Sequence, residues 1–116
     1  AKGQVSIAEY MALALNHYYS TRDPLGAAGD FITAPEISQI FGELVGAWVA
    51  DQWQRQGGNK AILMELGPGR GTLMRDILHA TRNIPDFHKS VEVQMVEISP
   101  SLQAIQKEAL HNAHPN

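Results

Sequence analysis

Three glycines at alternate positions and two glutamates suggest where this sequence could do chemistry. Gly67, Gly69 and Gly71 directly follow an apolar run, and Glu65 stands two residues before the first of them. Where a strand ends in a glycine-rich turn that opens a helix, backbone N–H groups and the helix dipole face the carboxyl edge of the strand. Glu97 ends a second apolar segment in the same way. The pattern predicts a ligand site at this edge.

Two familiar phosphate-binding motifs fit the turn less well. The dinucleotide motif places its third glycine three residues after the second, whereas here the glycines alternate and Thr72 follows them. This spacing disfavours a nicotinamide cofactor but leaves it as an alternative. A P-loop requires Gly-Lys followed by Ser or Thr, and Gly71 is followed by Thr72 and Leu73. The sequence therefore excludes a P-loop.

Composition narrows the class of protein. With 116 residues, 44% of them hydrophobic and 18% charged, the chain is typical of one globular domain. A formal charge of -3 without a cluster of Lys and Arg argues against nucleic acid as a partner. No apolar run reaches the roughly 18 residues of a membrane span, and the N-terminus lacks the layout of a secretory signal. The absence of cysteine fits a reducing compartment, so we expect the cytoplasm or an organelle matrix.

The N-terminal half is predicted to be helical. Ser6 and Glu9 have the spacing of a capping box before a helical apolar pattern, which predicts a helix over about 6–18. Residues 22–30 hold Pro, Gly and Asp without periodicity and predict an irregular loop. Thr33 and Pro35 then resemble a helix start, and a second helix is expected over about 34–56. Its apolar stripe is interpreted as core, part of which could face a protein partner: Ile37, Phe41, Leu44, Ala47 and Trp48.

The second half alternates between strands and helices. We expect strands over 61–66 and 91–98 and helices over 72–81 and about 100–110, the last one capped by Ser99 ahead of Pro100. This βαβα succession predicts an α/β fold with a parallel sheet. Two strands are fewer than a doubly wound sheet normally needs, so we expect the natural protein to continue with further strands.

The E-x-G-x-G-x-G pattern of Glu65, Gly67, Gly69 and Gly71 resembles the first motif of class I S-adenosylmethionine-dependent methyltransferases. The resemblance implies a Rossmann-like fold and S-adenosyl-L-methionine as the cofactor. It also implies that the glycine turn passes under the methionine and ribose and that the acid at the head of the motif contacts the methionine ammonium. Glu97 matches the family acid that binds both ribose hydroxyls, since one carboxylate can accept from two donors. Pro68 and Ile98 complete the expected cofactor contacts around these residues.

The segment from Tyr18 to Trp48, with its unusual run GDFITAPEISQIFGEL, resembles the MidA-like family of methyltransferases. The similarity extends from about Ser6 to Leu110. It implies an N-terminal helical segment, 1–58, that covers the cofactor pocket, followed by the start of the Rossmann-like cofactor-binding domain, 59–116. Further cofactor contacts are implied for the residues that match the family in the loop: Gly29, Asp30, Phe31 and Thr33.

The family resemblance also implies the reaction. Mitochondrial members are assembly factors of respiratory complex I, so a protein arginine methyltransferase is expected, with a complex I subunit as a possible substrate. The location would be the mitochondrial matrix in a eukaryote or the cytoplasm in a bacterium. The chain departs from the family before the tyrosine pair, where the usual extra Pro and Gly are missing near His17, and it lacks the later strands and substrate-binding insertions.

The sequence assigns no catalytic residue and no metal site. A protonated guanidinium would need carboxylates to orient it, but Asp30 and Glu36 are better explained as a loop cap and a helix-start residue. His111 and His114 have an H-x-x-H spacing without a third ligand, so solvated histidines are expected. A non-catalytic assembly or binding module with the same fold remains an alternative function.

Overall fold

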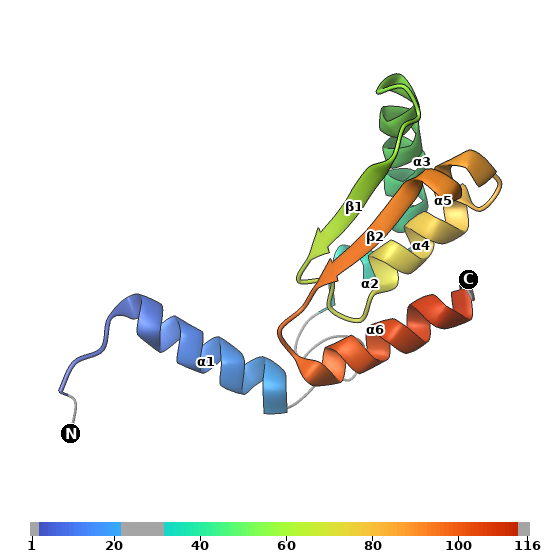
Figure 1. Cartoon of the computed structure of the whole chain (residues 1–116). Coiled ribbons are helices and arrows are strands. Elements are labelled where there is room, and N and C mark those ends of the chain that lie inside the picture. The colour runs from blue at the N-terminus through green and yellow to red at the C-terminus, as the bar shows by residue number, and fades with distance from the viewer. Residues whose placement is uncertain (1–2, 22–31, 114–116) are drawn as a thin grey trace.

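The computed structural model describes residues 3–21 and 32–113. Its elements follow the order of a helical N-terminal half and a mixed second half (Figure 1). They are α1 Ile7–Thr21, α2 Ala34–Ile37, α3 Gln39–Arg55, β1 Ala61–Leu66, α4 Thr72–Thr81, α5 Pro85–Ser90, β2 Val91–Val96 and α6 Pro100–Ala113. The irregular loop expected over 22–30 lies outside the described residues.

The two strands form a parallel pair. Ala61 pairs with Val91 and Leu66 with Val96, so both carboxyl ends lie at the same edge of the sheet. Helices α4 and α5 make the connection between the strands, and α3 packs along α4 behind the sheet in Figure 1. The predicted α/β fold with a βαβα succession is confirmed, and this topology brings the ends of β1 and β2 to one place.

The single helix expected over 34–56 is two helices. Ser38 between α2 and α3 has an extended backbone (φ −153°, ψ 126°), which interrupts the helical hydrogen bonds. Its hydroxyl oxygen accepts a hydrogen bond from the Ile40 N–H over 3.3 Å and so caps α3. The prediction of one helix was wrong because a serine can end one helix and cap the next.

The interpretation of the α3 apolar stripe as core was also wrong for most of its length. Leu44 and Trp48 are 67% and 63% exposed, and Ile37 and Phe41 are exposed as well. The face of α3 that packs on α4 carries small residues instead: Gly42, Gly46 and Ala50, all buried. A Cβ on Gly42 would lie only 2.5 Å from the Cβ of Asp76, so the two helices approach too closely for larger side chains.

The core lies between α4, α5, α6 and the sheet. Its fully buried side chains include Met74, Phe87 and Leu102. Phe87 meets the ring of Trp53 edge to face, with centroids 5.5 Å apart, and this contact fixes the end of α3 against α5. Helix α5 was not predicted, although Pro85 at its first turn followed by an acidic residue is a usual helix start.

Helix α1 extends away from the rest of the molecule in Figure 1. Its predicted capping box is confirmed, since Ser6 Oγ accepts from the Glu9 N–H and Glu9 accepts from the Ser6 N–H. The helix runs to Thr21, beyond the expected end, and the Ser99 hydroxyl donates to the Tyr19 carbonyl over 2.9 Å. This bond joins the C-terminal end of α1 to the start of α6.

Candidate cofactor site

The turn between β1 and α4 has a backbone that glycine alone adopts readily. Gly67, Gly69 and Gly71 have φ values of 64°, 55° and 81°, all in the left-handed region. The Gly67 N–H donates to the Val96 carbonyl over 2.9 Å, which ties the turn to the end of β2. The Gly71 N–H donates to the Pro68 carbonyl over 2.9 Å and closes the turn. The turn is therefore a defined structure held at the carboxyl edge of the sheet.

The outer glycines of the turn meet different surroundings. A Cβ on Gly67 would find nothing within 4 Å, and Gly67 lines an open cavity of about 410 Å³. A Cβ on Gly71 would lie 3.3 Å from Cγ of Gln106, a residue of α6. Gly67 thus leaves room for a ligand, whereas Gly71 leaves room for a helix of the protein itself. The cavity is within the range of small-molecule sites, roughly 300–1,000 Å³.

Glu65, near the carboxyl end of β1, presents a carboxylate to this cavity. Burial raises the pKa of Glu65 to about 7, and a hydrogen bond from the Met74 backbone acts in the opposite direction. Its Oε2 is buried and has no hydrogen-bond partner among the described residues. A buried carboxylate oxygen without a partner carries a desolvation cost that a cation or donor in the cavity would offset.

Glu97 follows the end of β2 and lines the same cavity. Its Oε1 accepts a hydrogen bond from the Ser99 N–H over 2.9 Å, which fixes the direction of the side chain. Its backbone carbonyl accepts from Gln103 Nε2 over 2.6 Å. The first turn of α6 thus holds this acid at the strand end, where the sequence pattern places it.

Most of the predicted cofactor residues gather around one cavity. Seven of them line it: Thr33, Glu65, Gly67, Pro68, Gly69, Glu97 and Ile98. Gly71 lies at the base of the turn against α6, as described above, and Gly29, Asp30 and Phe31 lie outside the described residues. Side chains that the sequence did not assign to the site complete the wall: Leu15, Tyr19, Pro35, Arg70, Thr72, Leu73 and Leu102. Their positions depend on how helices dock, which no local spacing reveals.

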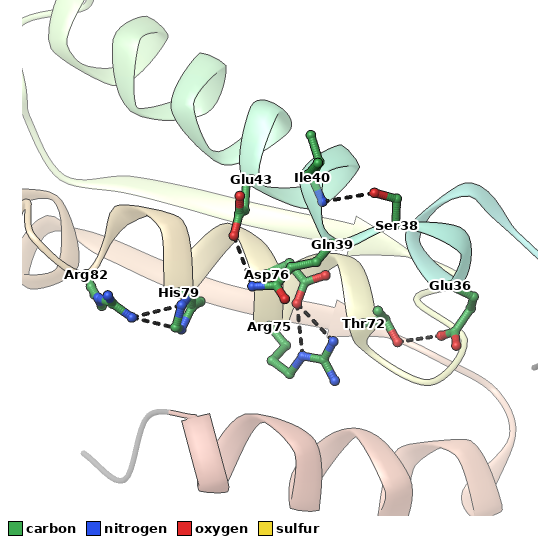
Figure 2. A network of polar contacts seen from close by, with 10 residues as sticks. All are labelled: Glu36, Ser38, Gln39, Ile40, Glu43, Thr72, Arg75, Asp76, His79 and Arg82. Carbon is green, nitrogen blue, oxygen red and sulfur yellow. Dashed lines mark hydrogen bonds and ion pairs between the residues drawn. The ribbon is translucent and has the colours of Figure 1, made fainter.

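Glu36 completes the cavity wall from the side of α2. Its carboxylate accepts a hydrogen bond from the Thr72 hydroxyl at the start of α4 (Figure 2). The predicted cap residue Thr33 makes no side-chain cap bond, and its carbonyl instead accepts from the Glu36 N–H over 2.9 Å. The bond between Glu36 and Thr72 connects the N-terminal half to the helix that follows the glycine turn.

Two kinds of feature, a cluster of metal ligands and a membrane-spanning helix, are not found in the part of the chain that the structure describes. In residues 3–21 and 32–113, no three His, Asp or Glu side chains are grouped so that they could hold a metal ion. His114, one of the paired histidines, lies outside these ranges. None of the helices within them is long and apolar enough to cross a membrane.

A glycine turn after β1, an acid after β2 and a cavity between them define a Rossmann-like class I methyltransferase type of site. The chain belongs to a methyltransferase family: residues 44–116 match the family model described as "Putative S-adenosyl-L-methionine-dependent methyltransferase". S-Adenosyl-L-methionine is the cofactor of this family, as the resemblance of the glycine motif implied. The family assignment leaves a nicotinamide-dependent oxidoreductase without support.

Similar proteins carry more specific names. The chain is 47% identical over 117 residues to "Protein arginine methyltransferase NDUFAF7, mitochondrial" of Danio rerio, covering 95% of this chain and 28% of the relative. It is 48% identical over 111 residues to the Homo sapiens protein of that name, covering 90% of this chain and 25% of the relative. The chain therefore spans about a quarter of the length of these relatives.

A solved structure shows the same fold. A protein from Burkholderia thailandensis, crystallised with S-adenosyl-homocysteine, superposes with a TM-score of 0.76 at 28% sequence identity. The match covers 96% of this chain and 30% of that chain. The resemblance to a class I methyltransferase is thus confirmed over nearly the whole sequence.

Proposed function

We propose that this chain is the cofactor-binding part of an S-adenosylmethionine-dependent protein arginine methyltransferase. The observation that carries the proposal is the meeting of Glu65, the open side of the glycine turn and Glu97 around one cavity. The buried Glu65 Oε2 without a partner fits the ammonium group of a methionine moiety. Family membership and the bound S-adenosyl-homocysteine of the bacterial structure support the same ligand.

Each residue has a definite task in this proposal. Glu65 pairs with the ammonium group, and Glu97 accepts hydrogen bonds from the two ribose hydroxyls. Gly67 and Gly69 let the cofactor approach the backbone of the turn, and Leu15 and Tyr19 of α1 shield the cavity from water. The cofactor supplies a methyl group on a sulfonium, so the protein contributes chiefly alignment and exclusion of water.

The names of the relatives support a proposed substrate and location, and the family resemblance of the sequence supports a proposed division of the chain. We propose an arginine side chain of a protein as the methyl acceptor, with a respiratory complex I subunit as the candidate, as the name of the relatives suggests. Residues 1–58 form the segment that covers the pocket and 59–116 the start of the cofactor-binding domain. The location would be the mitochondrial matrix in a eukaryote or the cytoplasm in a bacterium.

Titration calorimetry with S-adenosyl-homocysteine tests the proposal. We expect saturable binding to the wild-type chain and at least about tenfold weaker binding by Glu97→Ala, since two ribose hydrogen bonds are lost. Glu92→Ala, at an exposed position on β2 that does not line the cavity, is the matched control and should bind like the wild type. NADH serves as the competing ligand. Preferred binding of NADH, or no binding by a folded chain, would contradict the proposal.

A non-catalytic binding module is the second candidate function. The outward apolar stripe on α2 and α3, which ends in the exposed Leu44 and Trp48, is the observation that favours it. Binding of S-adenosyl-homocysteine distinguishes the two candidate functions. A chain that binds a protein partner through this stripe but does not bind S-adenosyl-homocysteine would be such a module.

A further inference from the structure

Gln106 of α6 is a long polar side chain that is almost completely buried, with 4% of its surface exposed. Its Nε2 donates a hydrogen bond to the backbone carbonyl of Gly69 over 2.6 Å. Glutamine is seldom fully buried, and a buried amide needs its polar atoms paired. The bond joins the middle of the glycine turn to a helix that lies 37 residues later in the chain.

This bond controls the direction of one peptide group in the turn. Gly69 has φ 55°, and glycine loses more conformational freedom on folding than any other residue, so its peptide group needs a partner to stay in one orientation. A trans peptide is planar, and its N–H and C=O point in opposite directions. Fixing the Gly69 carbonyl toward α6 therefore points the Arg70 N–H away from α6. Both Gly69 and Arg70 line the cavity.

The stem of the same side chain packs against the end of the turn. A Cβ on Gly71 would lie 3.3 Å from Gln106 Cγ and 3.5 Å from Gln106 Cα. A side chain at residue 71 would therefore press on the stem of Gln106, and the φ of 81° at this position also favours glycine. Gln106 contacts the turn twice, once by a hydrogen bond at Gly69 and once by packing at Gly71.

We propose that Gln106 is a positioning residue that holds the glycine turn in the conformation that receives the cofactor. Gln106 raises the affinity for the cofactor without contacting it. The turn is already ordered in the free protein, so it loses no further conformational freedom on binding. The role depends on the side-chain amide, since the Gly69 carbonyl needs a donor. The inference rests on the proposed function for the identity of the ligand and on the turn geometry for everything else.

Gln106→Met in the full chain separates the hydrogen bond from the packing. Methionine keeps the unbranched stem that lies on Gly71 but cannot donate to the Gly69 carbonyl. We expect the dissociation constant for S-adenosyl-homocysteine, measured by calorimetry, to rise on the order of tenfold, as for the loss of one hydrogen bond.

Thr81→Val is the matched control. Thr81 is also buried, and its hydroxyl donates to the Ile77 carbonyl over 2.9 Å, but it lies away from the cavity. Both variants should lower the thermal midpoint, and only Gln106→Met should weaken binding. Wild-type affinity in Gln106→Met, or an equal loss of affinity in Thr81→Val, would overturn the proposal.

Amide hydrogen exchange of the unliganded chain tests the positioning role independently of the ligand. We expect the Arg70 and Gly71 amides to exchange faster in Gln106→Met than in the wild type or in Thr81→Val. Failure of the wild type to bind S-adenosyl-homocysteine would refute the proposed function, and the exchange result would then decide the role of Gln106. Unchanged exchange at both amides would refute that role.

Discussion

At the scale of single residues, Glu65 has the environment that most clearly requires a ligand. Its pKa of about 7, against an ordinary value of 4.5, arises because burial disfavours the charged carboxylate. An ammonium group in the cavity favours the charged form, so ligand binding and ionisation of Glu65 are linked. The affinity of the wild-type chain for S-adenosyl-homocysteine should therefore fall as the pH is lowered through 7, by on the order of tenfold between pH 7.5 and 6.

Glu65→Gln tests this linkage by calorimetry across the same pH range. The variant should bind more weakly at pH 8 and show a flatter pH dependence, because a neutral amide replaces the titrating group. Glu92→Gln, an exposed position on β2, should retain the wild-type profile. Parallel profiles for wild type and Glu65→Gln would contradict the assignment.

The same raised pKa has a consequence for stability without ligand. Folded Glu65 holds its proton more tightly than the unfolded chain does, so its contribution to stability is present below pH 4.5 and is lost as the pH rises to about 7. The thermal midpoint of Glu65→Gln should thus rise relative to that of the wild type as the pH is increased from 5 to 8. A midpoint difference that stays constant over this range would show that the carboxyl is not desolvated.

The sequence could predict the site residues at the ends of strands, but not those that helices bring to the site. Glu65 and Glu97 could be placed from sequence because parallel strands bring their carboxyl ends together. Tyr19 and Gln106 could not, because their contacts with Ser99 and Gly69 arise from helix docking across the chain. Sequence periodicity carries no information on such distant contacts.

At the scale of elements, α3 can pack closely on α4 because glycine, which has no side chain, occupies positions 42 and 46 of α3. The helical period correctly grouped the apolar residues of α3 on one face, but it cannot tell which face is inside. The inner face is set by Gly42 and Gly46, where backbones come close, and the large apolar side chains point outward. The sequence pattern missed the break at Ser38. Tertiary packing decides whether this serine continues a helix or, with an extended backbone, ends α2 and caps α3.

Gly42→Ala tests this close approach. The new Cβ would lie 2.5 Å from Asp76 Cβ, and relief requires the two helices to move apart. We expect overpacking to outweigh the gain in helix propensity of about 1 kcal/mol and to lower the free energy of unfolding by roughly 1–2 kcal/mol, measured by urea denaturation. Gly3→Ala, where a Cβ meets nothing within 4 Å, should leave the stability unchanged. Equal stability of both variants would mean that α3 does not pack so closely.

At the scale of the whole molecule, the chain is more extended than its length requires. The radius of gyration is 16.9 Å, against about 13 Å expected for a compact chain of this length. The longest dimension of 58 Å comes from α1, which extends away from the sheet in Figure 1. The apolar side chains of the α3 stripe and of the β1 face, such as Trp48 and Leu66, are exposed on this extended shape.

Exposed apolar surface of this kind drives association in solution. We expect the 116-residue chain to associate with itself at concentrations that calorimetry requires, because contact between stripes removes Trp48 from water. Trp48→Lys should shift the sedimentation coefficient toward the monomer while changing the free energy of unfolding by less than about 0.5 kcal/mol. Gln54→Lys adds the same charge at an exposed α3 position off the stripe and should sediment like the wild type. If both variants shift toward the monomer, added charge rather than the stripe governs association. If neither variant shifts, the stripe is not the contact surface.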